Sequence, residues 1–323
     1  MIMAAFGSRR SACALVVLVF GLCVVVGGAR VDDGLEVTWG DDRGSVSPDG
    51  QVLSLSLDRT SSSGFRSRNT YLFARVDVQI KLVANNSAGT VTTCYVIKPA
   101  AHAGVVLSAI VGTFFWLGLV ELTVDFLFLF LQLISEGEWD VHDEVDLEFL
   151  GNVTGEPYTL HTNVFANGTG GKEQQFHLWF DPTADFHTYS IVWTSRHILV
   201  LVDGTPIREI KNNADKGVAY PASQQMRLYG TLWNADDWAT QGGRVKTDWS
   251  QAPFVAQYRN FTALDTTSAA TPAVAGGGTG YVQEIDATAQ QAMKWARDNY
   301  MVYDYCADTK RFPLAFPLEC AMP

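Results

Sequence analysis

The sequence predicts an all-β protein built as a sandwich of antiparallel sheets. Short runs of alternating apolar and polar residues recur along the chain, as in Val52–Leu57 and Tyr71–Leu82. Clusters of Gly, Pro, Asn and Asp separate these runs. The chain has 323 residues, 47% of them hydrophobic, which is enough to bury a substantial core.

The predicted strands continue through the second half of the chain. Asp203-Gly204 lies between two apolar runs and has the residue chemistry of a tight hairpin. Only Ala287–Tyr300 shows helical spacing, and the Ala- and Gly-rich stretch Ser268–Gly280 indicates a linker or loop. The strands expected here are Phe176–Phe180, Tyr189–Trp193, Ile198–Val202 and Ile207–Ile210.

The first 29 residues have the pattern of a secretory signal peptide. Arg9 and Arg10 form a basic start, Ala12–Val26 is apolar, and Gly27–Ala29 offers small residues for cleavage. An uncleaved membrane anchor is the alternative, but the apolar run is shorter than the ~20 residues that a spanning helix needs. Secretion is therefore expected, with no membrane partner.

Charge and cysteine content narrow the function further. Acidic residues outnumber basic ones by 34 to 23, so nucleic acid is not an expected partner and a neutral or weakly charged substrate fits better. After cleavage, Cys94, Cys306 and Cys320 would remain in an oxidising compartment. Cys306 and Cys320 are the predicted disulfide, because they enclose a short Pro-containing stretch that a cross-link would order.

Residues 142–150 hold three acidic residues at alternate positions. A strand there would place the polar side chains on one face and the apolar ones on the other. Acidic groups this close raise one another's pKa, an arrangement that catalysis can use. The polar set is His142, Glu144, Asp146 and Glu148, and the apolar set is Val145, Leu147 and Phe149.

Retaining glycoside hydrolysis suits this pattern. It needs a nucleophilic carboxylate and a protonated carboxyl about 5 Å apart. Cα atoms four residues apart in a strand are separated by ~13 Å, so the side chains of Glu144 and Glu148 must lean together. We assign Glu144 as nucleophile, Asp146 as the helper that hydrogen-bonds it, and Glu148 as acid/base. On spacing alone, a solvated acidic face and a calcium site remain alternatives.

Residues 142–152 closely resemble the signature of the xyloglucan endotransglucosylase/hydrolase branch of glycoside hydrolase family 16. The resemblance covers nearly the whole chain apart from the signal peptide, one apolar segment and the loop after Phe261. It implies a jelly-roll β-sandwich with a concave cleft for a β-1,4-glucan, a glycan on Asn152, and chemistry without a metal or cofactor. Segments that carry it include Gln79–Val83, Asn86–Thr92, Leu178–Thr183, Leu232–Thr240, Lys246–Trp249 and Arg311–Pro313.

The same resemblance implies a set of sugar-contacting residues. Trp233 and Trp238 would be stacking platforms, with core packing as the alternative. Many similar chains have Gln at the position of His161 and Arg at that of Lys172, and His161 and Arg311 could instead be ordinary surface residues. The other implied contacts are Thr162, Asn163, Gly171, Glu173, Ala239 and Gly243.

One segment interrupts this resemblance. Gly104–Ile134 is almost entirely apolar, and removing about 98–134 would restore a connection like that of the family. A transmembrane helix would put two halves of one sandwich on opposite sides of a membrane, and an apolar surface loop would promote aggregation. We favour a retained intron or gene-model error.

The expected organisation is a signal peptide over 1–29, a sandwich over 30–265 interrupted at about 98–134, and an extension over 266–323. The expected function is cleavage of xyloglucan with transfer to another xyloglucan chain or to water, by a monomer in the cell wall. The alternatives are a non-catalytic binder of wall polysaccharide and an inactive product of the retained intron.

Overall fold

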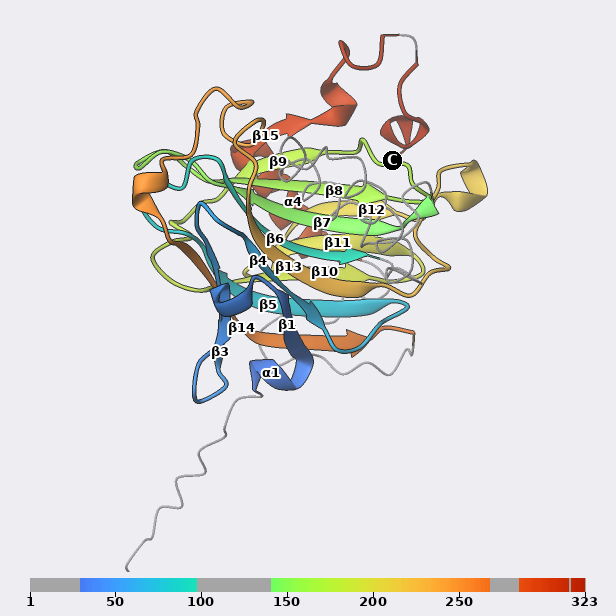
Figure 1. Ribbon diagram of the computed structural model, residues 1–323. Coiled ribbons are helices and arrows are strands. Elements are labelled where there is room, and N and C mark those ends of the chain that lie inside the picture. The colour runs from blue at the N-terminus through green and yellow to red at the C-terminus, as the bar shows by residue number, and fades with distance from the viewer. Residues whose placement is uncertain (1–29, 98–140, 268–284, 314, 323) are drawn as a thin grey trace, which may run out of the picture.

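The computed structural model describes residues 30–97, 141–267, 285–313 and 315–322 as two antiparallel sheets packed face to face (Figure 1). The expected signal peptide, the linker 268–280 and the interrupting segment 98–134 lie outside the described residues. The short helix α1, Val31–Gly34, precedes the first strand.

The eight-stranded sheet carries the acidic strand near its middle, and we call its side facing away from the other sheet the carboxylate face. At one edge of this sheet, Met301–Asp304, the last strand among the described residues, pairs with Gln174–His177. In spatial order the strands are β1 (Leu35–Trp39), β4 (Ser63–Ser67), β13 (Arg227–Asn234), β6 (Thr90–Ile97), β7 (Glu144–Leu150), β8 (Thr159–Phe165), β9 (Gln174–His177) and β15 (Met301–Asp304).

The seven-stranded sheet contains the predicted hairpin, in which Asp203 and Gly204 both have positive φ. Its strands, in spatial order, are β12 (Thr205–Lys211), β11 (His197–Val202), β10 (His187–Trp193), β5 (Ala74–Lys81), β14 (Phe254–Asp265), β3 (Val52–Leu57) and β2 (Gly44–Val46). The predicted strand at Tyr71 begins only at Ala74, because Phe73 has a φ of +66°, outside the extended region.

The core lies between the sheets and is built from the alternate apolar residues of each strand. Phe149 of β7 meets Tyr189 of β10 edge to face, with ring centroids 4.6 Å apart. Phe65 of β4 meets Tyr258 of β14 in the same way at 4.7 Å. These pairs join the two sheets and fix which face of β7 points outward.

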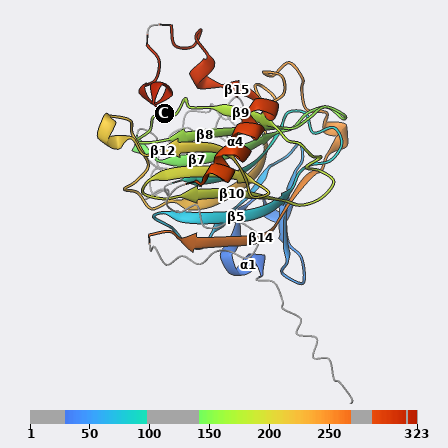
Figure 2. The same ribbon diagram turned by 180° about the vertical axis from the view of Figure 1, so that it is seen from behind.

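The predicted helix is confirmed as α4, Ala287–Tyr300. Asp286 caps it by accepting a hydrogen bond from the Ala289 backbone N–H at 2.8 Å. Ala289 and Met293 pack on outward-facing residues of the seven-stranded sheet, including Leu199 and Leu201, so α4 covers the back of the sandwich (Figure 2).

The C-terminal region contains the predicted disulfide between Cys306 and Cys320. Cys94, the remaining cysteine among the described residues, is buried in the core. The described residues also contain short 3-10 turns, at Asp41–Arg43, Ala214–Lys216, Trp249–Gln251, Tyr305–Ala307 and Leu318–Ala321.

Candidate active site

The acidic strand has the predicted alternation. Val145, Leu147 and Phe149 are completely buried in the core. The side chains of Glu144 and Glu148 keep 12% and 24% exposure on the carboxylate face. The strand therefore presents its acids to a ligand while its other face stabilises the sandwich.

Glu144 is oriented by the residue two positions before it. The Nε2 atom of His142 lies 3.1 Å from a carboxylate oxygen of Glu144. The His142 ring packs on Phe165, a cross-strand neighbour of Glu144 on β8, with centroids 4.9 Å apart. The Phe165 contact restricts the imidazole, so the contacted Glu144 oxygen has a defined partner.

Asp146 sits between the other two acids and is almost fully buried. Burial raises the pKa of this carboxyl well above its usual value, and the charge of Glu144 and a hydrogen bond with Glu144 raise it further. The Asp146 carboxyl therefore keeps its proton to a higher pH than a free carboxyl, and we assign the hydrogen bond of the pair to an Asp146 O–H that donates to the Glu144 carboxylate.

Glu148 has the environment of a general acid. Burial, then the nearby charges of Asp146 and Glu173, raise the pKa of the Glu148 carboxyl to about 8. A carboxyl with this pKa is protonated at neutral and acidic pH, and its partial exposure leaves it within reach of a ligand oxygen.

His161 is the direct cross-strand neighbour of Glu148. Its Nε2 atom is 3.7 Å from a Glu148 oxygen, and its Nδ1 atom is 3.0 Å from the amide nitrogen of Gln175. Burial lowers the pKa of His161 to about 4, and Arg208 and Arg311 add to this effect against the opposing charge of Glu173. The charged residues that act on this ring are thus one acid, Glu173, and two bases, Arg208 and Arg311.

Thr162 lies on the inner side of β8. Its side chain points into the interior, where the hydroxyl donates to the Gln174 carbonyl at 3.1 Å and accepts from the Arg208 guanidinium at 2.8 Å. Alternation along β8 causes this, because His161 and Asn163 occupy the outward positions. Thr162 therefore supports the site from behind, and its contact with a sugar stays a prediction.

Asn163 organises the loop that follows β8. Its side-chain oxygen accepts from the Lys172 backbone N–H at 3.0 Å. Gly171 has a φ of +80°, and a Cβ there would lie 3.1 Å from the Arg311 guanidinium, so a side chain would crowd this loop. Glu173 forms a two-point ion pair with Arg311, at 2.5 and 3.2 Å.

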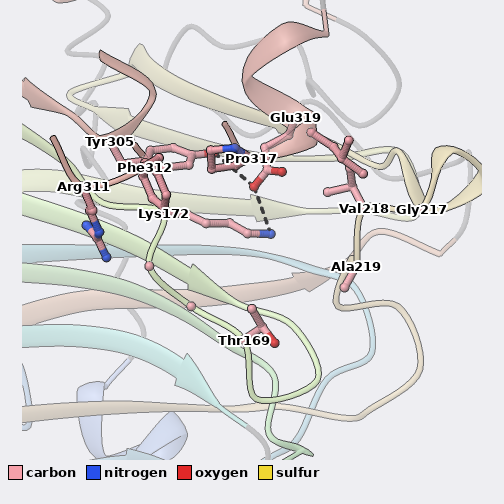
Figure 3. A pocket seen from close by; sticks show the side chains of 13 residues that line it. Thr169, Lys172, Gly217, Val218, Ala219, Tyr305, Arg311, Phe312, Pro317 and Glu319 are labelled. Carbon is pink, nitrogen blue, oxygen red and sulfur yellow. Dashed lines mark hydrogen bonds and ion pairs between the residues drawn. The ribbon is translucent and has the colours of Figure 1, made fainter. Parts of the chain in front are cut away.

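Lys172 points to the C-terminal extension. Its Nζ atom is 3.4 Å from Glu319, which also accepts a hydrogen bond from Tyr305 at 3.3 Å (Figure 3). A cavity of about 370 Å³ opens beside this pair, with Gly171 and Arg311 in its lining. The loop and the extension thus form one surface at this side of the site.

The predicted tryptophan platforms lie together. The centroids of Trp233 and Trp238 are 6.3 Å apart, and Trp238 keeps 36% exposure and lies 6.5 Å from the His161 ring. Ala239 is buried against Trp233, and Gly243 has no room for a Cβ, which would meet the Asp237 carbonyl oxygen at 1.9 Å. Ala239 and Gly243 therefore shape the loop that holds Trp238.

Asn152 lies two residues after the end of β7 and is partly exposed. It lines a groove of about 480 Å³ together with Asn85, Tyr158 and Phe180. Its side-chain nitrogen donates to the Pro157 carbonyl at 3.1 Å. Glycosylation of Asn152 stays a prediction.

Sequence reasoning missed two residues that bear on the site, Tyr95 and Arg208. Tyr95 pairs with Asp146 in the ladder and stacks on Tyr229, with centroids 5.7 Å apart. The buried Arg208 donates to the carbonyl oxygens of Thr162 and Lys172, behind the carboxylate face. The register of neighbouring strands brings Tyr95 to the site, and neither residue has a local sequence signal.

The described residues include no group of three or more His, Cys, Asp or Glu side chains placed to hold a metal ion. Within the same ranges, no helix combines the length and apolar character needed to cross a membrane.

Solved structures with this fold include a transglycosylase and a laminarinase. The apo Crh5 transglycosylase is 22% identical, with a TM-score of 0.50, over 75% of this chain and 82% of that one. The laminarinase from Rhodothermus marinus is 16% identical, with the same TM-score, over 74% and 92% of the two chains. These likenesses show the fold alone, a β-sandwich of the jelly-roll type.

Sequence comparison is more specific. The probable xyloglucan endotransglucosylase/hydrolase protein 23 of Arabidopsis thaliana is 48% identical over 93% of both chains. Xyloglucan endotransglucosylase protein 1 of Diospyros kaki is 48% identical over 95% of this chain and 93% of its own.

Two family profiles also match the chain. The profile "Glycosyl hydrolases family 16" matches residues 31–105 and 127–251, and "Xyloglucan endo-transglycosylase (XET) C-terminus" matches residues 272–320. The gap between the first two ranges falls inside the apolar segment. With matches over most of its length, the chain belongs to the xyloglucan endotransglucosylase/hydrolase branch of glycosyl hydrolase family 16.

Proposed function

We propose that this enzyme cleaves the β-1,4-glucan backbone of xyloglucan with retention and transfers the released segment to another xyloglucan chain or to water in the plant cell wall. The observation that carries this proposal is the contrast between the outer acids. Asp146 holds a proton that it shares with Glu144, while burial keeps Glu148 protonated. One strand therefore presents a nucleophile and an acid.

In the first step, the Glu144 carboxylate attacks the anomeric carbon. Glu148 gives its proton to the glycosidic oxygen as that bond breaks, and the released chain leaves with a new hydroxyl group. Asp146 keeps its hydrogen bond to Glu144 and so orients the attacking carboxylate.

In the second step, Glu148 acts as the base. It takes the proton of an acceptor hydroxyl or of water, whose oxygen forms a bond to the anomeric carbon as the ester to Glu144 breaks. His161 and Glu173 lie on the side of Glu148 that faces the C-terminal extension, where Glu173 pairs with Arg311 of that extension. We assign this side to the acceptor. Trp233 and Trp238 would hold the sugar rings by stacking.

The test uses the secreted chain with xyloglucan and a labelled xyloglucan oligosaccharide. We expect labelled polymer from the wild type and at least a ~10³-fold loss of turnover in Glu144→Gln with unchanged thermal unfolding. Asp237→Asn, an exposed acid near Trp238, is the matched control and should keep turnover. Polymer binding without any product from the wild type would identify a non-catalytic binder instead.

A further inference from the structure

His161 lies in a row of side chains that crosses three strands. Glu148 of β7, His161 of β8 and Gln175 of β9 are successive cross-strand partners, so their side chains share the carboxylate face. The row places one nitrogen of the imidazole toward the acid and the other toward an amide. His161 therefore bridges the catalytic strand and the strand nearest the C-terminal extension.

Gln175 selects the tautomer of this histidine. A neutral imidazole has one N–H donor and one acceptor nitrogen. The Gln175 amide nitrogen can only donate, and it lies 3.0 Å from Nδ1, so Nδ1 is the acceptor. The proton of His161 then sits on Nε2, which lies on the Glu148 side at 3.7 Å.

The surroundings keep this imidazole neutral. Burial lowers the pKa of His161 most, and the positive charges of Arg208 and Arg311 add to this effect against the opposing charge of Glu173. The acid nearest to Nε2 is Glu148 itself, at 3.7 Å. The exposed partner on the other side is the ring of Trp238, which carries no charge. Asp146 and Glu173 are the acids that act on Glu148 itself.

We propose that His161 is a positioning residue for Glu148: its Nε2–H, held in place by Gln175, donates to the Glu148 carboxylate once that group has given up its proton. This inference rests on the acid/base role proposed above for Glu148. The Nε2–O distance of 3.7 Å is longer than a hydrogen bond, and a rotation of the carboxyl group closes it as charge develops. The donor would favour ionised Glu148 and so offset part of the effect of burial.

The consequence is a shift in the pH dependence of the first step. His161→Phe keeps a ring but removes the N–H group that donates to Glu148. We expect the alkaline limb of the kcat/KM profile for the cleaved polymer to shift to higher pH by about 0.5 to 1 pH unit. Gln175→Leu removes the amide that fixes the His161 tautomer. The Nδ1–H tautomer, in which Nε2 is an acceptor, then becomes accessible, and the limb should shift in the same direction. In the double variant the two shifts should not add, because both remove one interaction.

Two further variants separate this role from others. His161→Gln restores an N–H donor and should return the limb toward the wild-type position. His187→Phe changes a histidine of β10, in the other sheet, that stacks on Phe180 and contacts Asp203, and should leave the limb unchanged. An unshifted limb in His161→Phe with a raised KM for the acceptor would make His161 a sugar contact and overturn the proposal.

A measurement on the wild-type chain that needs no turnover tests the proposal even if the variants fold poorly. Nitrogen-15 NMR of the intact chain distinguishes histidine tautomers, and His161 is assigned among six histidines by comparison with His161→Gln. A neutral Nε2–H tautomer at pH 6 supports the proposal. An Nδ1–H tautomer or a charged ring contradicts it, whereas an inactive wild type contradicts the proposed function and leaves the NMR result to decide this inference.

Discussion

Ile97 and Glu144 are partners in the antiparallel ladder of β6 and β7. The last residue of one strand therefore lies beside the first residue of the next, and the ladder itself needs only a short connection between them. This relationship bears directly on the segment 98–134, which separates the two residues in sequence.

Removal of residues 98–134 should leave the sandwich intact. The remaining connection, residues 135–143, is long enough to join neighbours in a ladder. We expect the shortened chain to unfold cooperatively at a temperature at least equal to that of the full chain, measured by circular dichroism. A chain with a Gly-Ser sequence of equal length at 98–134 controls for loop length. Loss of folding in the shortened chain alone would show that the sandwich requires this segment.

The activity should fall in alkaline solution because Glu148 must be protonated in the first step. With a pKa of about 8, kcat/KM should decline about tenfold per pH unit above that value. Glu148→Gln should remove this limb along with most activity. A flat profile to pH 10 in the wild type would exclude Glu148 as the acid.

The same carboxyl should make stability depend on pH. Its pKa is higher in the folded chain than in the unfolded one, so the folded state holds the proton more tightly. This contribution is complete below the ordinary carboxyl pKa and is lost as pH rises toward 8. Denaturant unfolding should show a smaller decrease over this pH window in Glu148→Gln than in the wild type.

Thr162 should matter for stability more than for sugar binding. Thr162→Val removes the hydroxyl between Gln174 and Arg208 and should lower the free energy of unfolding by about 1–3 kcal/mol, with little change in the acceptor KM. Thr162→Ser keeps the hydroxyl and should recover most of the loss. A raised acceptor KM in stable Thr162→Val would return Thr162 to the sugar-binding residues.

The disulfide should support acceptor binding through Arg311 and Glu319, which both lie in the loop that it closes. Replacing both cysteines, Cys306→Ala and Cys320→Ala, should lower stability by ~3 kcal/mol and raise the acceptor KM. Cys94→Ala is the control, because this buried thiol is away from the loop. An acceptor KM equal to that of the wild type would separate the loop from acceptor binding.

The sequence predicted the parts of this fold that local pattern determines. The alternation in β7 and the stripe of α4 were predicted correctly because burial on one side dictates them. The inward position of Thr162 follows from the same alternation, which shows that a family-based contact needs to be checked against strand register. Tyr95 and Arg208 could not be predicted, since the pairing of strands distant in sequence brings them to the site.

The pairing of β15 with β9 has a consequence for how the chain is made. β9 is synthesised long before β15, so its outer edge lacks a strand partner until Met301–Asp304 emerge from the ribosome. β9 contains the polar residues Gln174 and Gln175, which suit a strand edge that stays unpaired for a time without pairing with other chains. The ion pair between Glu173 and Arg311 can form only after Arg311 is synthesised, so the side of the site that we assign to the acceptor is completed last.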